Sequence, residues 1–93
     1  MEGMNKASLI QTVAKGTGLS RNEVAAATNA LIDVISGALI RGERVTITGF
    51  GTFDISHRQA RAGVNPRTGK RIEIAAMKLP RFRAGKSLRV RVK

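Results

Sequence analysis

Cysteine is absent from this 93-residue sequence, and histidine occurs once, at His57. The absence of cysteine excludes disulfide frameworks, cysteine-ligated zinc and thiol catalysis. With no second histidine and no cluster of carboxylates, the sequence cannot complete a metal site or a catalytic triad. We therefore expect a protein that is not an enzyme, with no cofactor, no metal and no small-molecule substrate.

Long hydrophobic runs are also missing. No apolar run approaches the roughly 20 residues that a membrane span needs. The first ten residues, MEGMNKASLI, lack the hydrophobic centre of a signal peptide. We expect a soluble intracellular protein that does not bind membranes. Met1-Glu2-Gly3, ahead of Met4, is an N-terminal extension or reflects an alternative start, and it is left out of the fold prediction.

Acidic residues are scarce in the second part of the chain. Residues 1–57 contain five basic and five acidic side chains, whereas residues 58–93 contain twelve basic side chains and one acidic one, Glu73. The formal net charge of +11 therefore lies entirely in the last 36 residues. This segregation indicates a neutral scaffold joined to a cationic surface that binds a polyanion.

Two helices are predicted in the neutral part. Asn5 is a plausible N-cap for the first helix, which the Gly16-Thr17-Gly18 segment ends. Ser20 and Glu23 have the spacing of a capping box at the start of a second helix that runs to about Ile40. Because neither helix carries a basic face, we interpret them as core rather than as a helix-turn-helix DNA reader.

The hydrophobic period changes to two after Gly42. Val45 and Ile47 form one alternating segment, Phe53 and Ile55 form another, and Gly49-Phe50-Gly51 is predicted to join them as a hairpin. Phe50 at this turn is poorly placed for burial within so small a domain. A second copy of the chain would cover it, so the sequence favours a homodimer with a shared core.

Residues 58–75, RQARAGVNPRTGKRIEIA, are here called the arm. Asn65-Pro66-Arg67-Thr68-Gly69 is a turn signal between two short extended segments. Such a ribbon has too few apolar residues to bury a core, so it should protrude. A two-stranded ribbon fits a DNA groove, where its arginines contact phosphates and the minor-groove floor. Pro66 either wedges between base pairs or only shapes the turn.

The C-terminal residues SLRVRVK fit two structures. Leu88, Val90 and Val92 alternate as in a strand, but Leu88 and Val92 also have the i,i+4 spacing of a helix. The local pattern leaves both open.

These residues together resemble the bacterial histone-like DNA-bending proteins, HU and integration host factor, and HU in particular. The resemblance extends over nearly the whole chain from Met4. Its most specific parts are Gly49-Phe50-Gly51-Thr52-Phe53, Arg58, Arg61, Gly63, Asn65-Pro66-Arg67-Thr68-Gly69 and Phe82-Arg83-Ala84-Gly85-Lys86.

The resemblance implies an α+β fold. Two chains would form an intertwined dimer, each with an N-terminal helical hairpin, a three-stranded antiparallel sheet, a protruding β-ribbon arm and a short C-terminal helix. Residues 1–93 would be one domain, with residues 4–42 for dimerisation, 43–57 and 76–93 for a sheet saddle and C-terminal element, and 58–75 for the arm. The implied dimer core is Leu31, Ile35, Leu39, Phe50, Phe53 and Phe82.

The resemblance also implies non-sequence-specific binding and bending of double-stranded DNA, with Pro66 intercalating from the minor groove. Bent, nicked or flexible DNA would be preferred, and the protein would be cytoplasmic and nucleoid-associated. The implied DNA-binding residues are Arg58, Arg61, Asn65, Pro66, Arg67, Thr68, Lys70, Arg71, Arg83 and Lys86. The alternatives are a site-specific bending factor of the integration host factor type and, ranked lower, an RNA-binding regulator.

Overall fold

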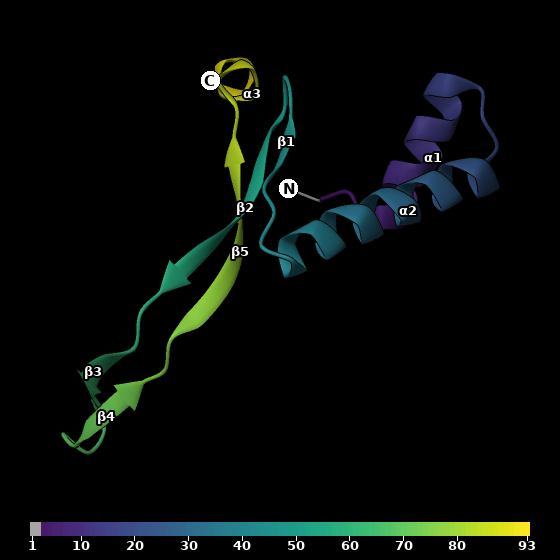
Figure 1. Ribbon diagram of the computed structural model, residues 1–93. Helices are drawn as coiled ribbons and strands as arrows, with labels where there is room; N and C mark the ends of the chain where they lie inside the picture. Colours follow the sequence, from purple (N-terminus) through teal and green to yellow (C-terminus); the bar gives the residue numbers. More distant parts are fainter. Residues whose placement is uncertain (1–2) are drawn as a thin grey trace. The chain divides into compact units, whose positions relative to one another are not determined.

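The computed structural model describes residues 3–93, so Met1 and Glu2 of the N-terminal extension lie outside the described residues. The chain divides into two compact units, the first ending at Gly37 and the second running from Ala38 to Lys93. The elements of each unit are shown in Figure 1.

The first unit is helical, and helix α1 spans Lys6–Thr17. The predicted N-cap is confirmed: Asn5 Oδ1 accepts a hydrogen bond from the Ser8 N–H at 2.9 Å, and Ser8 Oγ accepts one from the Asn5 N–H at 2.8 Å. Two backbone donors are thereby satisfied at the helix start. The helix continues through Gly16 and ends where Gly18 adopts φ 77° and its N–H donates to the Ala14 carbonyl.

Helix α2 spans Arg21–Ile40, as the sequence predicts. Its capping box is confirmed, because Ser20 Oγ accepts from the Glu23 N–H at 3.1 Å and Glu23 Oε1 accepts from the Ser20 N–H at 3.0 Å. The two hydrogen bonds stabilise the Glu23 carboxylate, with the backbone bond the larger effect, and hold its pKa below the ordinary 4.5. Beyond the helix, Gly42 has φ 81° and provides the turn into the sheet.

Much of the apolar surface of α2 is exposed in the single chain. Leu31 is 56% exposed and Val34 68%. By length and composition alone, α2 is long and apolar enough to cross a membrane, which corrects the expectation that no segment approaches this length. The core helix of a soluble protein passes the same test, so this property is weak evidence for a membrane span.

The second unit contains a three-stranded antiparallel sheet in the order β1-β2-β5. The strands are β1 (Val45–Ile47), β2 (Gly51–Arg58) and β5 (Met77–Ala84). The predicted β1–β2 hairpin is confirmed, with Gly49 at φ 86° in its turn. Pro80 is tolerated within β5 because this strand lies at the sheet edge, where a missing N–H interrupts no ladder.

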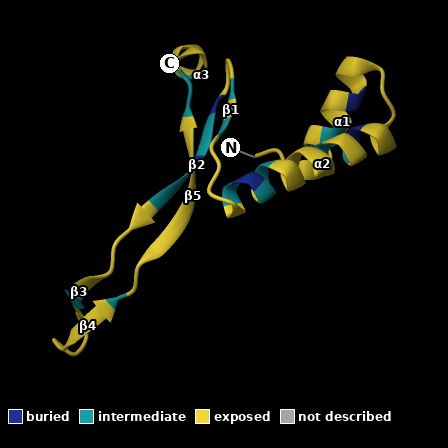
Figure 2. Cartoon of the chain, in the orientation of Figure 1, coloured by how far each residue is buried: buried dark blue, intermediate teal, exposed yellow. Residues whose placement is uncertain are grey.

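One face of this sheet is apolar. The Phe82 ring lies between those of Phe50 and Phe53, with centroids 5.1 and 4.9 Å away. Phe50 is nevertheless 44% exposed, as expected for a turn residue that its own chain does not cover. Figure 2 shows the buried and half-buried residues of the sheet gathered in β1 and the first part of β2, while most of β5 and the ribbon beyond is exposed.

The arm contains a separate two-stranded antiparallel sheet of β3 (Arg61–Val64) and β4 (Arg71–Ile74). It lies beyond the ends of β2 and β5 (Figure 1). The β2–β5 ladder ends with the pair Arg58 and Met77, and the β3–β4 ladder begins with Arg61 and Ile74. Two residues on each chain segment therefore separate the two ladders.

The C-terminal segment is a helix, α3 (Lys86–Val92), so the helical spacing of Leu88 and Val92 holds and the strand-like alternation does not. Gly85 makes the connection, because its N–H donates to the Phe50 carbonyl at 2.9 Å while its own carbonyl accepts from the Arg89 N–H at 3.0 Å.

Candidate nucleic-acid interface

The tip of the arm is a turn held by its own hydrogen bonds. The Asn65 N–H donates to the Lys70 carbonyl, and the Gly69 N–H to the Asn65 carbonyl, both at 2.8 Å. Asn65 Oδ1 accepts from the Arg67 N–H at 2.8 Å. Gly69 has φ 72°, a conformation that disfavours residues with a Cβ. Pro66 lies exposed at this turn, so its rigid ring is available to a ligand.

Both faces of the arm carry arginine. Side chains alternate along a strand, and the register therefore places Arg61 on one face with Ile72 and Ile74, while Arg71 lies on the other face with Glu73. Gly63 lies on the same face as Ile72 and Ile74, and a Cβ at this position would lie 2.9 Å from Ile74 Cδ1, the free end of a flexible side chain. A groove that encloses the ribbon would therefore meet positive charge on either side.

All the predicted cations of the arm are solvent-exposed. Among residues 3–93, the ion pairs are Arg41–Glu43, Arg81–Asp54 and Arg83–Asp54, and none involves an arm cation. The positive charge of the arm cations is thus available to an external anion. These side chains are Arg58, Arg61, Arg67, Lys70 and Arg71.

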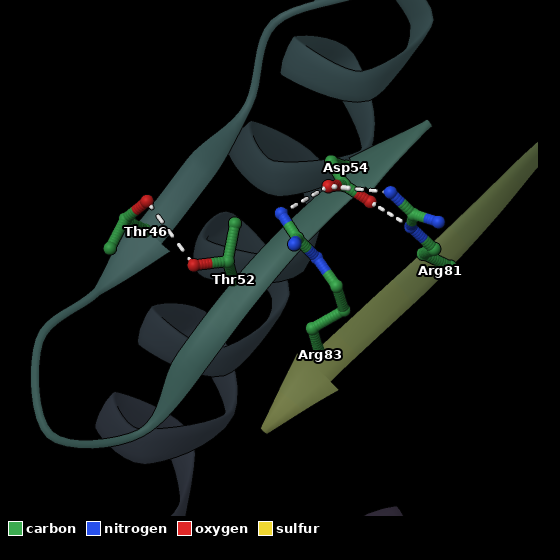
Figure 3. Close-up of polar contacts among 5 residues, drawn as sticks. All are labelled: Thr46, Thr52, Asp54, Arg81 and Arg83. Atoms are coloured by element: carbon green, nitrogen blue, oxygen red, sulfur yellow. Dashed lines mark hydrogen bonds and ion pairs between the residues drawn. The ribbon is translucent and has the colours of Figure 1, made fainter. Parts of the chain in front are cut away.

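The second face of the three-stranded sheet is polar and is shown in Figure 3. Asp54 lies on β2 opposite Arg81 on β5. Asp54 Oδ1 accepts from Arg81 Nε at 2.7 Å, and Asp54 Oδ2 accepts from Arg83 Nη2 at 2.8 Å. Thr46 and Thr52 meet beside them, with hydroxyl oxygens 3.4 Å apart.

The Asp54 carboxylate is largely buried, with 8% of its side chain exposed, whereas the Arg81 and Arg83 side chains are 49% and 52% exposed. The hydrogen bond from Arg81, assisted by the positive charges of Arg81 and Arg83, outweighs burial and holds the pKa of Asp54 below its ordinary 3.8. The same bond raises the pKa of Arg81. This carboxylate is therefore ionised at neutral pH.

The structure places the predicted interface residues in two groups within the second unit. Eight lie on the arm, while Arg83 lies on the polar sheet face and Lys86 begins α3. The Asn65 side chain helps to hold the turn, because its oxygen accepts the hydrogen bond from the Arg67 N–H, and only its NH2 group stays free. Sequence reasoning missed Arg81 and Asp54; their strand alternation was readable, but the β2–β5 register that pairs them was not.

The predicted core residues are only partly brought together. Phe50, Phe53 and Phe82 form one aromatic cluster. Leu31 and Ile35 belong to the first unit, and Leu39 to the second. Among the residues that the structure describes, no group of three or more His, Cys, Asp or Glu side chains could hold a metal ion.

Known proteins of similar sequence and structure carry the name HU. The chain is 46% identical over 90 residues to DNA-binding protein HU from Staphylococcus aureus and, separately, to that from Geobacillus stearothermophilus; each comparison covers 97% of this chain and 100% of the relative. An Anabaena HU–DNA cocrystal structure matches with a TM-score of 0.87 and 38% identity, covering 96% of this chain and 97% of that one. HU from Thermotoga maritima matches with a TM-score of 0.69 and 31% identity, covering 97% of this chain and 100% of that one.

The TM-score to the Anabaena HU–DNA structure shows that the two chains share one fold. Residues 4–93 match the family model described as bacterial DNA-binding protein, and the chain belongs to that family.

Proposed function

We propose that this protein binds double-stranded DNA without sequence specificity and bends it, as an architectural protein of the nucleoid in the cytoplasm, with no catalytic role. The observation that carries the proposal is the arm: five exposed basic side chains, one acid and a self-braced turn with Pro66 exposed. The chain's similarity to HU proteins, one of them solved with DNA, supports the same function.

The arm supplies the charge that such binding needs. Each cation that neutralises a phosphate releases condensed counterions, and this release drives association regardless of base sequence. A ribbon in the minor groove would bring Arg61 and Arg71 to opposite sides of the groove. Intercalation of the Pro66 ring would unstack one base step and kink the duplex, so DNA that is already bent, nicked or flexible would bind more tightly.

The proposed DNA contacts divide between the arm and the sheet. Thr68 and the free amide of Asn65 would supplement the arm cations, while Arg83 and Lys86 would meet the phosphates of DNA lying across the saddle, formed by residues 43–57 and 76–93. The proposed contact residues are Arg58, Arg61, Asn65, Pro66, Arg67, Thr68, Lys70, Arg71, Arg83 and Lys86.

The proposal includes a homodimer in which residues 4–42 contribute most of the dimerisation surface. Exposed Leu31 and Val34 on α2 and half-exposed Phe50 and Phe82 need an apolar cover. A second copy supplies the same surfaces to both partners. It also supplies a second arm, so that one duplex is gripped at two points.

The salt dependence of binding tests the electrostatic part. Arg71→Gln removes one arm cation per protomer and two per homodimer, so the slope of log K against log salt should become less steep by about 1.8. Lys15→Gln on α1 removes the same charge away from the arm and should keep the wild-type slope. Equal slopes for both variants and the wild type would refute the proposed arm contacts.

The bending step is tested with Pro66→Ala. The turn should persist, because Asn65 and Gly69 hold it without Pro66, and affinity for straight duplex should stay near that of the wild type. Fluorescence transfer between the ends of the bound duplex should report a smaller bend. Gln59→Ala, also on the arm, is the control. An unchanged bend angle would leave Pro66 with only a turn-forming role.

The homodimer is tested with Phe50→Ala, which should increase the monomer fraction in sedimentation equilibrium because it removes a ring from the shared core. Val64→Ala removes an exposed apolar side chain from the arm and should leave the dimer intact. A wild-type protein that sediments as a monomer would exclude the homodimer.

Sequence specificity is tested by competition between one chosen duplex and bulk genomic DNA. Preferential binding to the chosen duplex would indicate a site-specific factor.

A further inference from the structure

We propose that Asp54 is a positioning residue for DNA binding: it fixes the Arg81 and Arg83 guanidinium groups side by side on the polar sheet face, where they receive DNA phosphates. This inference rests on the proposed function. It adds two residues, Arg81 and Asp54, to the interface, and it gives Asp54 a role in DNA binding despite its negative charge.

The hydrogen bonds leave the outer edges of both arginines free. Arg81 uses Nε and Nη2 on Asp54, the latter at 3.4 Å, and Arg83 uses Nη2. A guanidinium has five N–H donors, so Arg81 Nη1 and Arg83 Nε and Nη1 make no bond to the carboxylate. Figure 3 shows the two guanidinium groups meeting the carboxylate from different sides.

Burial separates the acid from the surface that an anion would reach. The Asp54 side chain is 8% exposed and both arginine side chains are about half exposed. A phosphate that approaches from solvent therefore meets the arginines before it meets the carboxylate. The cluster carries a net charge of +1, so it still attracts an anion.

Strands β2 and β5 also have a backbone ladder that is separate from this cluster. Strands β2 and β5 are paired residue for residue from Gly51 with Ala84 to Arg58 with Met77, and the aromatic cluster packs on the opposite face. The Asp54 contacts instead restrict long side chains that would otherwise lose rotamer freedom on binding. Restricting them beforehand lowers that entropic loss and strengthens DNA binding.

Asp54→Asn separates this role from a simple charge effect, because the two predict opposite signs. Removing one negative charge should tighten DNA binding, as expected for the matched control Asp33→Asn on an exposed part of α2. An asparagine oxygen can accept from one arginine while its amide repels the other. Loss of positioning should therefore weaken binding by about three- to tenfold.

The test measures duplex affinity at fixed salt for the wild type, Asp54→Asn and Asp33→Asn. It repeats the Asp54→Asn comparison in an Arg81→Gln/Arg83→Gln background, where the substitution should no longer weaken binding. Affinity of Asp54→Asn equal to or above that of Asp33→Asn would overturn the inference. So would a loss that persists in the glutamine background, because it would arise from the fold rather than from the arginines.

Nuclear magnetic resonance of the wild-type protein provides a second test, and it does not depend on whether any variant folds. The Arg81 Nε–H signal should stay hydrogen-bonded when duplex is added. Loss of this hydrogen bond when DNA is added would overturn the inference. Phosphate would then replace Asp54 as the partner of Arg81, instead of binding to an arginine that Asp54 holds in place. Absence of duplex binding by the wild type would overturn the proposed function and this inference together, whereas wild-type binding with either adverse result overturns the inference alone.

Discussion

Gly51, the first residue of β2, is the position where the sheet should tolerate a side chain least. It is buried, and a Cβ on its backbone would lie 2.5 Å from Phe82 Cζ and 2.6 Å from the Arg83 carbonyl oxygen. The Phe82 ring is itself held between Phe50 and Phe53. Gly51→Ala should therefore disturb the aromatic cluster and the β2–β5 ladder together.

The expected loss of stability depends on whether the atoms that a Cβ at Gly51 would meet can move. Extra atoms in a packed core cost about 1–3 kcal/mol when side chains can adjust. At Gly51 one of the obstructing atoms belongs to the backbone of the paired strand, so we expect the upper end, about 3 kcal/mol. For a domain of this size, that loss lowers the melting temperature by about 12–24 °C.

Thermal and denaturant unfolding measure this effect, at one protomer concentration because dimerisation would contribute to stability. Gly63→Ala is the matched control in a strand of the arm. Its Cβ would meet Ile74 Cδ1 at 2.9 Å, the free end of a flexible side chain, so its unfolding free energy should stay near that of the wild type. Equal unfolding free energies for Gly51→Ala and the wild type would contradict the packing of Phe82 against Gly51.

Two further predictions concern acid and helix capping. Asp54 and Glu23 have folded-state pKa values below their ordinary 3.8 and 4.5, so the unfolded chain binds protons more readily than the folded one. The two ionised carboxylates therefore stabilise the fold fully above these ordinary pKa values. This stabilisation is lost as the pH falls through the lower, folded-state pKa values. Unfolding measured from pH 6 to pH 2 should show this loss, and Asp54→Asn should reduce it; an identical pH profile would contradict the role of Asp54. Ser20→Ala removes the N-cap of α2 and should lower the free energy of unfolding by about 1 kcal/mol, measured by denaturant unfolding. Ser87→Ala leaves the caps of α1 and α2 intact and is the control. Equal losses of stability for the two variants would argue against the cap.

The elements that sequence reasoning predicted correctly are those specified by close neighbours along the chain. The Asn5 cap and the Ser20–Glu23 capping box each involve side chains three residues from their partners. The turn at Asn65 is closed by bonds to residues two, four and five positions away. Such interactions depend on residue type and spacing alone, and both can be read from the sequence.

The C-terminal segment was ambiguous because its pattern satisfies two periods at once. Leu88 and Val92 fit one helical face, yet Val90 between them completes a strand alternation. The backbone decides the matter: Gly85 bonds to Phe50 on one side and accepts from Arg89 on the other, which starts a helix. The contact with Phe50 spans 35 residues, and no local pattern contains it.

The Asp54 cluster shows the same limit at the functional surface. By composition, Asp54 is one of the five acids that cancel five bases in residues 1–57, and the resemblance to HU places Arg83 at the interface without any partner. Asp54 and Arg81 are 27 residues apart, and only the β2–β5 register brings them together. Had β5 been displaced by one residue, Arg81 and Arg83 would lie on the aromatic face and the carboxylate would lose both partners. The charge of this surface is therefore set by strand register as much as by composition, and a count of basic residues cannot reveal how their guanidinium groups are held.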